Sequence, residues 1–295
     1  MEELVGSEKY MNPLSDFGFG KIFFHESNKD LLINFLNELL GGQERITDIS
    51  YQPAVQFGET EADRKAIYDV FCINDKGEHL IIEMQKAKQT HFRDRCVFYA
   101  TYPLQKQAPK GKWDFELKAV YMIAIADFVI FDEFEDDREH CIEYVDLLRR
   151  RTKTLYSNKL NFVFVELPKF TKGINELETN IDKWLFSLRH LSQLDARPPE
   201  IQGKIFEKLY NTAQTKQLTS LEMETYRKSI LEYYDIQDCM SCARHEGELR
   251  GEEKGKLEGE KRATIEVAKN LKKIGMDARQ IKACTNLSED EINRL

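Results

Sequence analysis

The hydrophobic positions near the start of the chain predict an amphipathic helix that ends at about residue 41. Apolar residues recur there at the spacing of one helical face, and they are Leu31, Leu32, Phe35, Leu36, Leu39 and Leu40. Ser27 is a suitable N-cap, Asp30 lies in the first turn near the positive end of the helix dipole, and Gly41 can close the helix. We expect this helix to open a mixed α/β unit that covers the first 130 residues.

The next apolar segments predict a β-hairpin followed by a helix and a buried strand. Residues 65–73 and 79–86 have strand character, and Asp75-Lys76-Gly77 between them is typical of a three-residue hairpin loop with Gly in the left-handed conformation. A helix is expected from about residue 89 to 107. The near-continuous apolar run of residues 117–126 predicts a strand that is covered on both faces.

The second half of the chain changes from strands to helices. Residues 141–148 and 161–167 predict another strand pair, with a basic connection, and the pattern is helical beyond residue 171. Glycines then recur every four residues within a Glu/Lys/Arg-rich stretch, at Gly247, Gly251, Gly255 and Gly259. A solvated helical linker is favoured there over a helix–helix contact face. We divide the chain into a mixed α/β part (1–170), a helical region (171–243), this linker (244–262) and a small helical tail (263–295).

The tail after residue 262 has helix-turn-helix-like spacing. A DNA-reading role is one interpretation. The candidate recognition segment, residues 288–295, is acidic and short, so an element for packing or homo-oligomerisation is favoured.

Composition narrows the class of protein. Of the 295 residues, 41% are hydrophobic and 32% charged, which is sufficient for a real core and excludes a wholly disordered chain. The longest apolar run, residues 119–126, is far short of the roughly 20 residues that span a bilayer, so no membrane partner is expected. The start of the chain lacks the features of a signal peptide, and six scattered cysteines indicate a reducing cytoplasm. The net charge of −8 argues against a general positive coat for nucleic acid.

Candidate chemistry lies on the predicted hairpin. A loop centred on Lys76 places Asp69 directly opposite Glu83, with their Cβ atoms about 5 Å apart. Two carboxylates on neighbouring strands are ligands that Mg²⁺ or Mn²⁺ prefers, with water and phosphate completing the coordination shell. Gln85 shares that face and can orient a water or a phosphate oxygen. The alternative is a solvated sheet face with Lys65 as a counter-charge.

These residues resemble a known family. Asp69 followed by Glu83-Met84-Gln85 resembles the PD-(D/E)XK nuclease signature in its variant with Gln at the usual Lys position. The opening Met-Asn-Pro-Leu-Ser-Asp-Phe-Gly-Phe-Gly-Lys-Ile-Phe (residues 11–23) is similar to the start of the Rpn family of recombination-promoting nucleases and transposases. Residues 92–99 and 166–170 and the Gly/Glu/Lys-rich tail extend this resemblance over nearly the whole chain.

The resemblance implies a metal-dependent DNA endonuclease with an αβββαβ core. By position, Asp69 and Glu83 would ligate the metal, and Gln85 would stand where a Lys is usual. An amide supplies no positive charge, and Lys65, Lys86 or Lys88 could substitute for the missing lysine. Strand alternation predicts that Lys86 points to the opposite face from Gln85.

Other candidates have a functional and a structural interpretation each. Asp16 is expected to cap a helix rather than to bind metal. Glu38 could add a metal-ligating oxygen, although a solvated position is favoured. Arg95 and Tyr99 share a helical face and could hold a phosphate and a sugar or base, or could simply pack together.

The basic connection, defined by Arg149, Arg150 and Arg151, could track a DNA backbone or be a solvated turn. The competing function for the whole chain is a catalytically weak relative that binds DNA or a protein through its helical C-terminal half.

Overall fold

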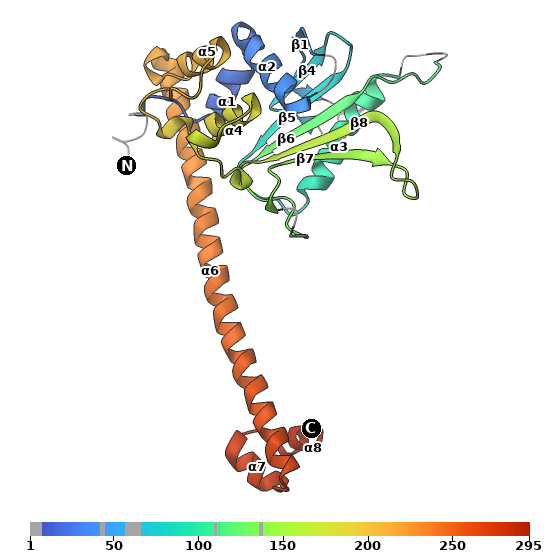
Figure 1. Ribbon diagram of the computed structural model, residues 1–295, viewed down its shortest axis with the longest axis vertical. Helices are drawn as coiled ribbons and strands as arrows, with labels where there is room; N and C mark the ends of the chain where they lie inside the picture. Colours follow the sequence, from blue (N-terminus) through green and yellow to red (C-terminus); the bar gives the residue numbers. More distant parts are fainter. Residues whose placement is uncertain (1–7, 42–44, 57–65, 109–110, 112, 136–137) are drawn as a thin grey trace. The chain divides into compact units, whose positions relative to one another are not determined.

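The computed structural model describes residues 8–41, 45–56, 66–108, 111, 113–135 and 138–295. A six-stranded mixed sheet lies among the helices of its N-terminal part (Figure 1). Neighbouring strands run β1 (Ile49–Tyr51), β4 (Val70–Asn74), β5 (His79–Gln85), β6 (Val120–Ala126), β8 (Leu155–Glu166) and β7 (Ile142–Leu148). β5 is antiparallel to β4 and parallel to β6, which is parallel to β8. A second, two-stranded sheet pairs β2 (Val55–Gln56) with β3 (Ala66–Ile67). The predicted α/β class is therefore confirmed.

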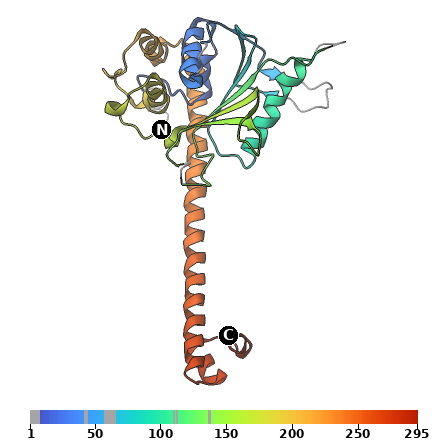
Figure 2. The same ribbon diagram turned by 45° about the vertical axis from the view of Figure 1, so that its right-hand side comes forward.

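Helices cover both faces of the large sheet (Figure 2). The helices on one face are α1 (Asp16–Phe23), α2 (Lys29–Leu40), α4 (Asn180–His190) and α5 (Lys204–Thr212). The other face is covered by α3 (Phe92–Lys106). On β6, Ile123 and Ile125 enter the first core whereas Met122 and Ala124 enter the second. This double cover explains why the sequence of β6 is apolar almost without interruption.

The hairpin of β4 and β5 has the register that the sequence predicts. Val70 pairs with Ile82 and Ile73 pairs with His79, so the turn is centred on Lys76. Gly77 has a φ of 78°, the left-handed conformation expected of it.

The first long helix, α2, also agrees with the prediction except at its start. Gly41 closes it with a φ of 57°. Its N-cap is Asn28 rather than Ser27, because residues 26–28 form a short 3₁₀ turn before the helix begins. Short 3₁₀ helices lie at Glu26–Asn28, Leu167–Lys169, Ile174–Glu176, Leu191–Gln193 and Thr215–Gln217.

The segment that follows β8 is anchored by buried charge. Glu166 is fully buried and accepts hydrogen bonds from the backbone N–H groups of Ile130 and Phe131, and Lys169 Nζ lies 2.6 Å from Glu166 Oε2. Arg189 of α4 donates to the carbonyl oxygen of Leu167 at 3.0 Å. These contacts fix the loop after β6 against the end of β8, because a buried carboxylate must find donors.

The chain forms two compact units, residues 1–237 and 238–295. Helix α6 (Ser220–Lys273) begins in the first unit, where Tyr226 and Ile230 are fully buried. The second unit holds the rest of α6 with α7 (Ala278–Thr285) and α8 (Glu289–Asn293), around a small core of Ala268, Ile281, Leu287 and Ile292. None of the helices that the structure describes has the length and apolarity needed to cross a membrane.

The second unit contains the helix starts that its sequence predicts. Asp277 caps α7 and Ser288 caps α8, each in a capping box. A Cβ atom at any of the four regularly spaced glycines would meet no atom within 4 Å, which agrees with a solvated stretch of helix. The four-part division of the chain stays a prediction.

Candidate active site

The candidate site lies where the parallel strands end. Gln85, Ala126 and Glu166 are in register at the carboxyl ends of β5, β6 and β8. Asp69 directly precedes β4, and Glu83 follows the last paired residue of the hairpin on β5. The hairpin therefore brings both carboxyl groups to the same end of the sheet.

The two carboxyl groups have unequal surroundings. Asp69 keeps exposed surface, and its Oδ2 accepts a hydrogen bond from the Met84 backbone N–H at 2.6 Å. Glu83 is only 3% exposed, and its Oε1 is buried without a hydrogen-bond partner among the residues that the structure describes. A buried acceptor without a partner is costly, and it indicates a place for a ligand.

Electrostatics set the charge of this pair. Burial, and then the nearby charge of Asp69, raise the pKa of Glu83 to about 8, and the guanidinium of Arg95 opposes this rise. Desolvation is also the main cause that raises the pKa of Asp69, with Asp16 adding to it. The Met84 N–H and the charges of Arg95 and Lys86 lower the pKa of Asp69. The pair therefore favours any cation that can approach both carboxylates.

Arg95 of α3 is the first such cation. Its Nη2 donates to Glu83 Oε2 and to Gln85 Oε1, both at 3.0 Å, and its guanidinium lies over the Tyr99 ring at 5.2 Å. Arg95 and Tyr99 share a helical face and pack together, as one interpretation predicts, and Arg95 also contacts Glu83. A role of the pair in contacting DNA stays a prediction.

Lys86 and Asp16 join the cluster from another direction. Lys86 Nζ lies 2.7 Å from Asp16 Oδ1, and Lys86 is 7% exposed. The prediction that Lys86 and Gln85 point to opposite faces is confirmed, because Lys86 pairs with Asp16 of α1 whereas Gln85 contacts Arg95 of α3 on the other face of the sheet. The N-cap of α1 is Ser15, which accepts from the Gly18 N–H at 3.1 Å, so Asp16 is a first-turn residue and not the cap.

Some candidates lie elsewhere. Glu38 pairs with Arg45 at 3.1 Å, and its neighbours Asn37 and Leu40 line a hollow of about 400 Å³ with Lys76, at the turn end of the hairpin. The structure therefore does not bring Glu38 to Asp69 and Glu83. Lys65 lies outside the described residues.

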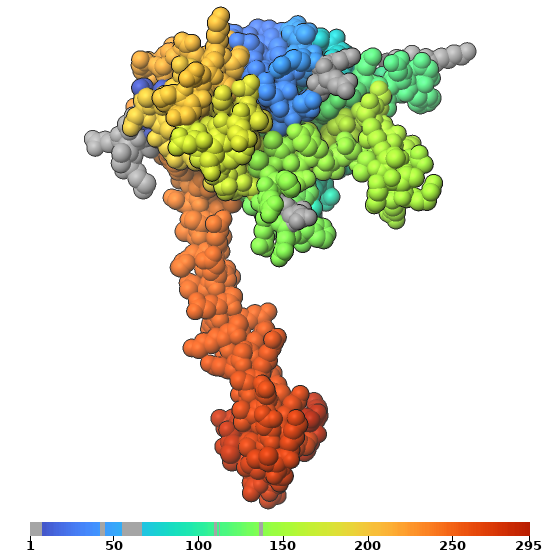
Figure 3. Space-filling view, viewed as in Figure 1, coloured from blue at the N-terminus to red at the C-terminus, as the bar shows by residue number. Residues whose placement is uncertain are grey.

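The basic connection lies in the exposed turn between β7 and β8, a hairpin whose outer part protrudes from the first unit (Figure 3). The site is at the Glu166 end of β8, whereas the turn lies beyond Leu155. At about 3.3 Å per residue, that strand separates the two ends by roughly 35 Å. Arg149, Arg150 and Arg151 therefore do not belong to the carboxylate cluster.

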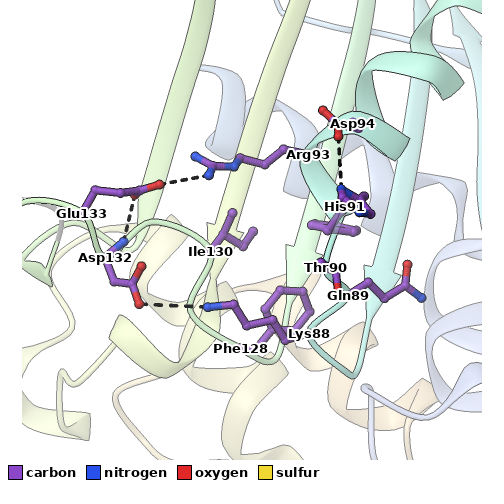
Figure 4. A pocket seen from close by; sticks show the side chains of 11 residues that line it. Lys88, Gln89, Thr90, His91, Arg93, Asp94, Phe128, Ile130, Asp132 and Glu133 are labelled. Atoms are coloured by element: carbon purple, nitrogen blue, oxygen red, sulfur yellow. Dashed lines mark hydrogen bonds and ion pairs between the residues drawn. The ribbon is translucent and has the colours of Figure 1, made fainter.

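Two hollows flank the loop that follows β5. One, of about 350 Å³, contains the ion pairs Arg93–Glu133 at 2.9 Å and Lys88–Asp132 at 4.0 Å (Figure 4). The second, of about 540 Å³, is lined by Gln89, Thr90, His91, Asp94, Arg95, Phe98 and Tyr99. Because Arg95 also contacts Glu83, the second hollow lies beside the carboxylate pair.

The end of β6 is held to α6 by a network that the sequence did not reveal. Asp127 Oδ2 accepts from Tyr233 Oη at 2.9 Å and from Gln237 Nε2 at 3.0 Å, while its backbone N–H donates to the Gln85 carbonyl. Burial raises the pKa of Asp127. More than 100 residues separate the partners, so no local pattern could identify them.

The residues present fit a divalent metal with few protein ligands. The described part of the chain contains no cluster of three or more His, Cys, Asp or Glu side chains suited to a metal. Mg²⁺ commonly takes only one or two carboxylates and completes its shell with water and substrate phosphate. Asp69 and the partnerless oxygen of Glu83 supply that minimum, and Gln85 adds an amide oxygen nearby.

The mixed sheet, with paired carboxylates at the end of its central hairpin and Gln two residues later, defines the class of PD-(D/E)XK nucleases. Residues 13–243 match the family described as PD-(D/E)XK nuclease family transposase, and the chain belongs to that family. This finding confirms, at the family level, the resemblance to recombination-promoting nucleases. No curated protein and no solved structure gives a significant match to the chain.

Proposed function

We propose that the protein is a divalent-metal-dependent DNA endonuclease in which Asp69 and Glu83 bind Mg²⁺ or Mn²⁺. The observation that carries the proposal is Glu83 Oε1, which is buried without a partner among the described residues next to a second carboxylate. Membership of a nuclease and transposase family supplies the substrate class, DNA.

The bound ion would lower the pKa of a water and neutralise charge on the phosphate. The chain's own residues would provide the positions. Asp69 and Glu83 hold the ion, and the Gln85 amide, two residues from Glu83, orients the attacking water or a phosphate oxygen. Arg95 and Tyr99 contact the DNA from α3, beside the hollow of about 540 Å³ that they partly line.

A second DNA contact is proposed at the basic connection. Arg149, Arg150 and Arg151 lie roughly 35 Å from the site, which corresponds to about ten base pairs of duplex at 3.4 Å each. The chain has a net charge of −8, so only short basic clusters such as this one can attract the DNA phosphates. Because such contacts are electrostatic, DNA affinity should fall strongly as the salt concentration rises.

Cleavage of plasmid DNA tests the proposal. Purified protein should nick or linearise it with Mg²⁺ or Mn²⁺ and not with EDTA, and Asp69→Ala should reduce the rate by at least about 100-fold because half of the metal site is lost. Asp132→Asn is a matched control, since Asp132 is exposed and pairs with Lys88 outside the carboxylate pair. Equal cleavage by Asp69→Ala and the wild type would overturn the assignment.

Two observations favour a second candidate, a catalytically weak module that binds DNA, a protein or a second copy through its helical C-terminal half. Gln85 carries no charge, and Arg95 already neutralises Glu83. Calorimetry with Mn²⁺ distinguishes the two functions, because a binding module should show no heat that depends on Asp69. For either function we propose a cytoplasmic setting in recombination, mobile elements or defence.

A further inference from the structure

The proposed active site lacks a lysine at the position where PD-(D/E)XK nucleases usually have one, since Gln85 is uncharged. Three lysines were candidates to replace it. Lys65 lies outside the described residues, and Lys88 is turned toward Asp132 in the neighbouring hollow, with 56% of its side chain exposed. Lys86 alone among the described candidates joins the carboxylate cluster, 2.7 Å from Asp16.

The position of Lys86 is built into the fold. Its side chain is only 8% exposed, and it directly follows Gln85 at the end of β5, where the strand reaches the carboxylate pair. A long, flexible lysine side chain loses conformational entropy when it is buried, so its burial here requires a compensating interaction. The Asp16 carboxylate provides that interaction, and its 66% exposed side chain keeps the pair at the surface of the site.

Asp16 is itself held by a tight turn at the start of α1. A Cβ atom on Gly18 would lie 2.0 Å from the Asn12 carbonyl oxygen, so only glycine fits there. The Phe17 N–H donates to Ser229 Oγ at 3.0 Å, and the Asn12 N–H donates to Tyr226 Oη at 2.9 Å. Both acceptors belong to α6, which therefore helps to fix the residue that holds Lys86.

We propose that Lys86 supplies the positive charge that Gln85 lacks, with its ammonium group contacting a non-bridging oxygen of the scissile phosphate. Asp16 is then a positioning residue. In the hydrolysis, a water oxygen bonds to phosphorus, the bond from phosphorus to the leaving sugar oxygen breaks, and a water proton ends on that oxygen. Lys86 stabilises the negative charge that develops on the phosphate. This inference rests on the proposed nuclease function.

Parallel substitutions of Lys86 and Lys88 test the proposed role of Lys86. Lys86→Gln should lower kcat about 100-fold or more with little change in KM, the effect expected when one preorganised donor to a transition-state charge is lost. Lys86→Arg should keep a substantial part of the activity, and Lys88→Gln should be close to wild type. Loss of activity in Lys88→Gln with wild-type kcat in Lys86→Gln would overturn the inference.

Moving the lysine from position 86 to position 85 distinguishes an effect on catalysis from an effect on folding. The double variant Gln85→Lys/Lys86→Gln should recover at least about tenfold of the kcat lost in Lys86→Gln, since a lysine then stands at the usual position. Asp16→Asn keeps the Lys86 ammonium but removes the carboxylate that positions it. The kcat of this variant should therefore lie between those of the wild type and Lys86→Gln. If Lys86→Gln and the double variant are misfolded by circular dichroism, Asp16→Asn still decides, because wild-type kcat in that variant would refute the role of the Lys86–Asp16 pair.

Metal binding gives a readout independent of cleavage. Removal of a positive charge beside Asp69 should tighten Mn²⁺ binding to Lys86→Gln several-fold in calorimetry, whereas an unchanged affinity would count against Lys86 lying near the ion. The two proposals also fail separately. A wild type without cleavage or Asp69-dependent metal binding refutes the nuclease function, while an active wild type with a fully active Lys86→Gln refutes only this inference.

Discussion

Replacement of Arg95 by methionine should lower the free energy of unfolding of the metal-free protein and raise its affinity for Mg²⁺. The Arg95 guanidinium contacts Glu83 Oε2 at 3.0 Å, with 28% of the Arg95 side chain and 4% of the Glu83 side chain exposed. Breaking a fully buried pair costs about 3–5 kcal/mol. Here the cost should be nearer 2 kcal/mol, because Arg95 is partly solvated and Glu83, with a pKa of about 8, can take up a proton at neutral pH.

The gain in metal affinity follows from Coulomb's law. A dication and a guanidinium held by the same carboxylate would repel each other by about 2 kcal/mol even with the dielectric constant of water. After screening by salt, its removal should tighten the Kd about tenfold, which adds about 1.4 kcal/mol of stability at saturating Mg²⁺. For a unit of this size, the increase of Tm on adding Mg²⁺ should be about 3–6 °C larger than in the wild type.

Thermal unfolding with EDTA and with Mg²⁺, together with calorimetry, measures both effects. Arg93→Met is the matched control, because Arg93 lies on the same helix but pairs with Glu133 at 2.9 Å, outside the carboxylate pair. It should leave the Mg²⁺ affinity unchanged. An Arg95→Met variant that binds Mg²⁺ no more tightly than the wild type would refute the view that Arg95 competes with the metal.

Two further predictions concern stability. Trp184 is fully buried between Phe23 and Phe35, and its Nε1 donates to Asn34 at 2.8 Å, so Trp184→Ala should cost about 3–5 kcal/mol in urea unfolding; a loss below 1 kcal/mol would contradict this packing. The hydrogen bond from Lys21 is the main cause that lowers the pKa of Glu222 to about 2. A lowered carboxyl pKa stabilises the fold above the ordinary value of 4.5, and this stabilisation is lost as the pH falls from there toward 2. Glu222→Gln should therefore cost up to about 1 kcal/mol at pH 7 and almost nothing at pH 2, and an equal cost at both would exclude the ion pair as its cause.

Several features of the candidate site could be predicted from local sequence patterns. The loop residues Asp75-Lys76-Gly77 were sufficient to predict the register that sets Asp69 against Glu83, because a short turn fixes which residues face each other. The helical spacing of Arg95 and Tyr99 likewise predicted a shared face. Strand alternation also predicted correctly that Lys86 and Gln85 point to opposite faces, since Lys86 pairs with Asp16 of α1 and Gln85 contacts Arg95 of α3.

The sequence by itself determined the class of fold, the hairpin, the paired carboxylates and the helix ends at Gly41, Asp277 and Ser288, since these depend on residues close together in the chain. The tertiary structure alone decided which distant groups reach the site. The Arg95 contact with Glu83, the pairing of Lys86 with Asp16 and the hold of α6 on Asp127 all join separate elements. Such contacts depend on how helices pack on the sheet, and the spacing of residues along one chain segment does not specify that packing.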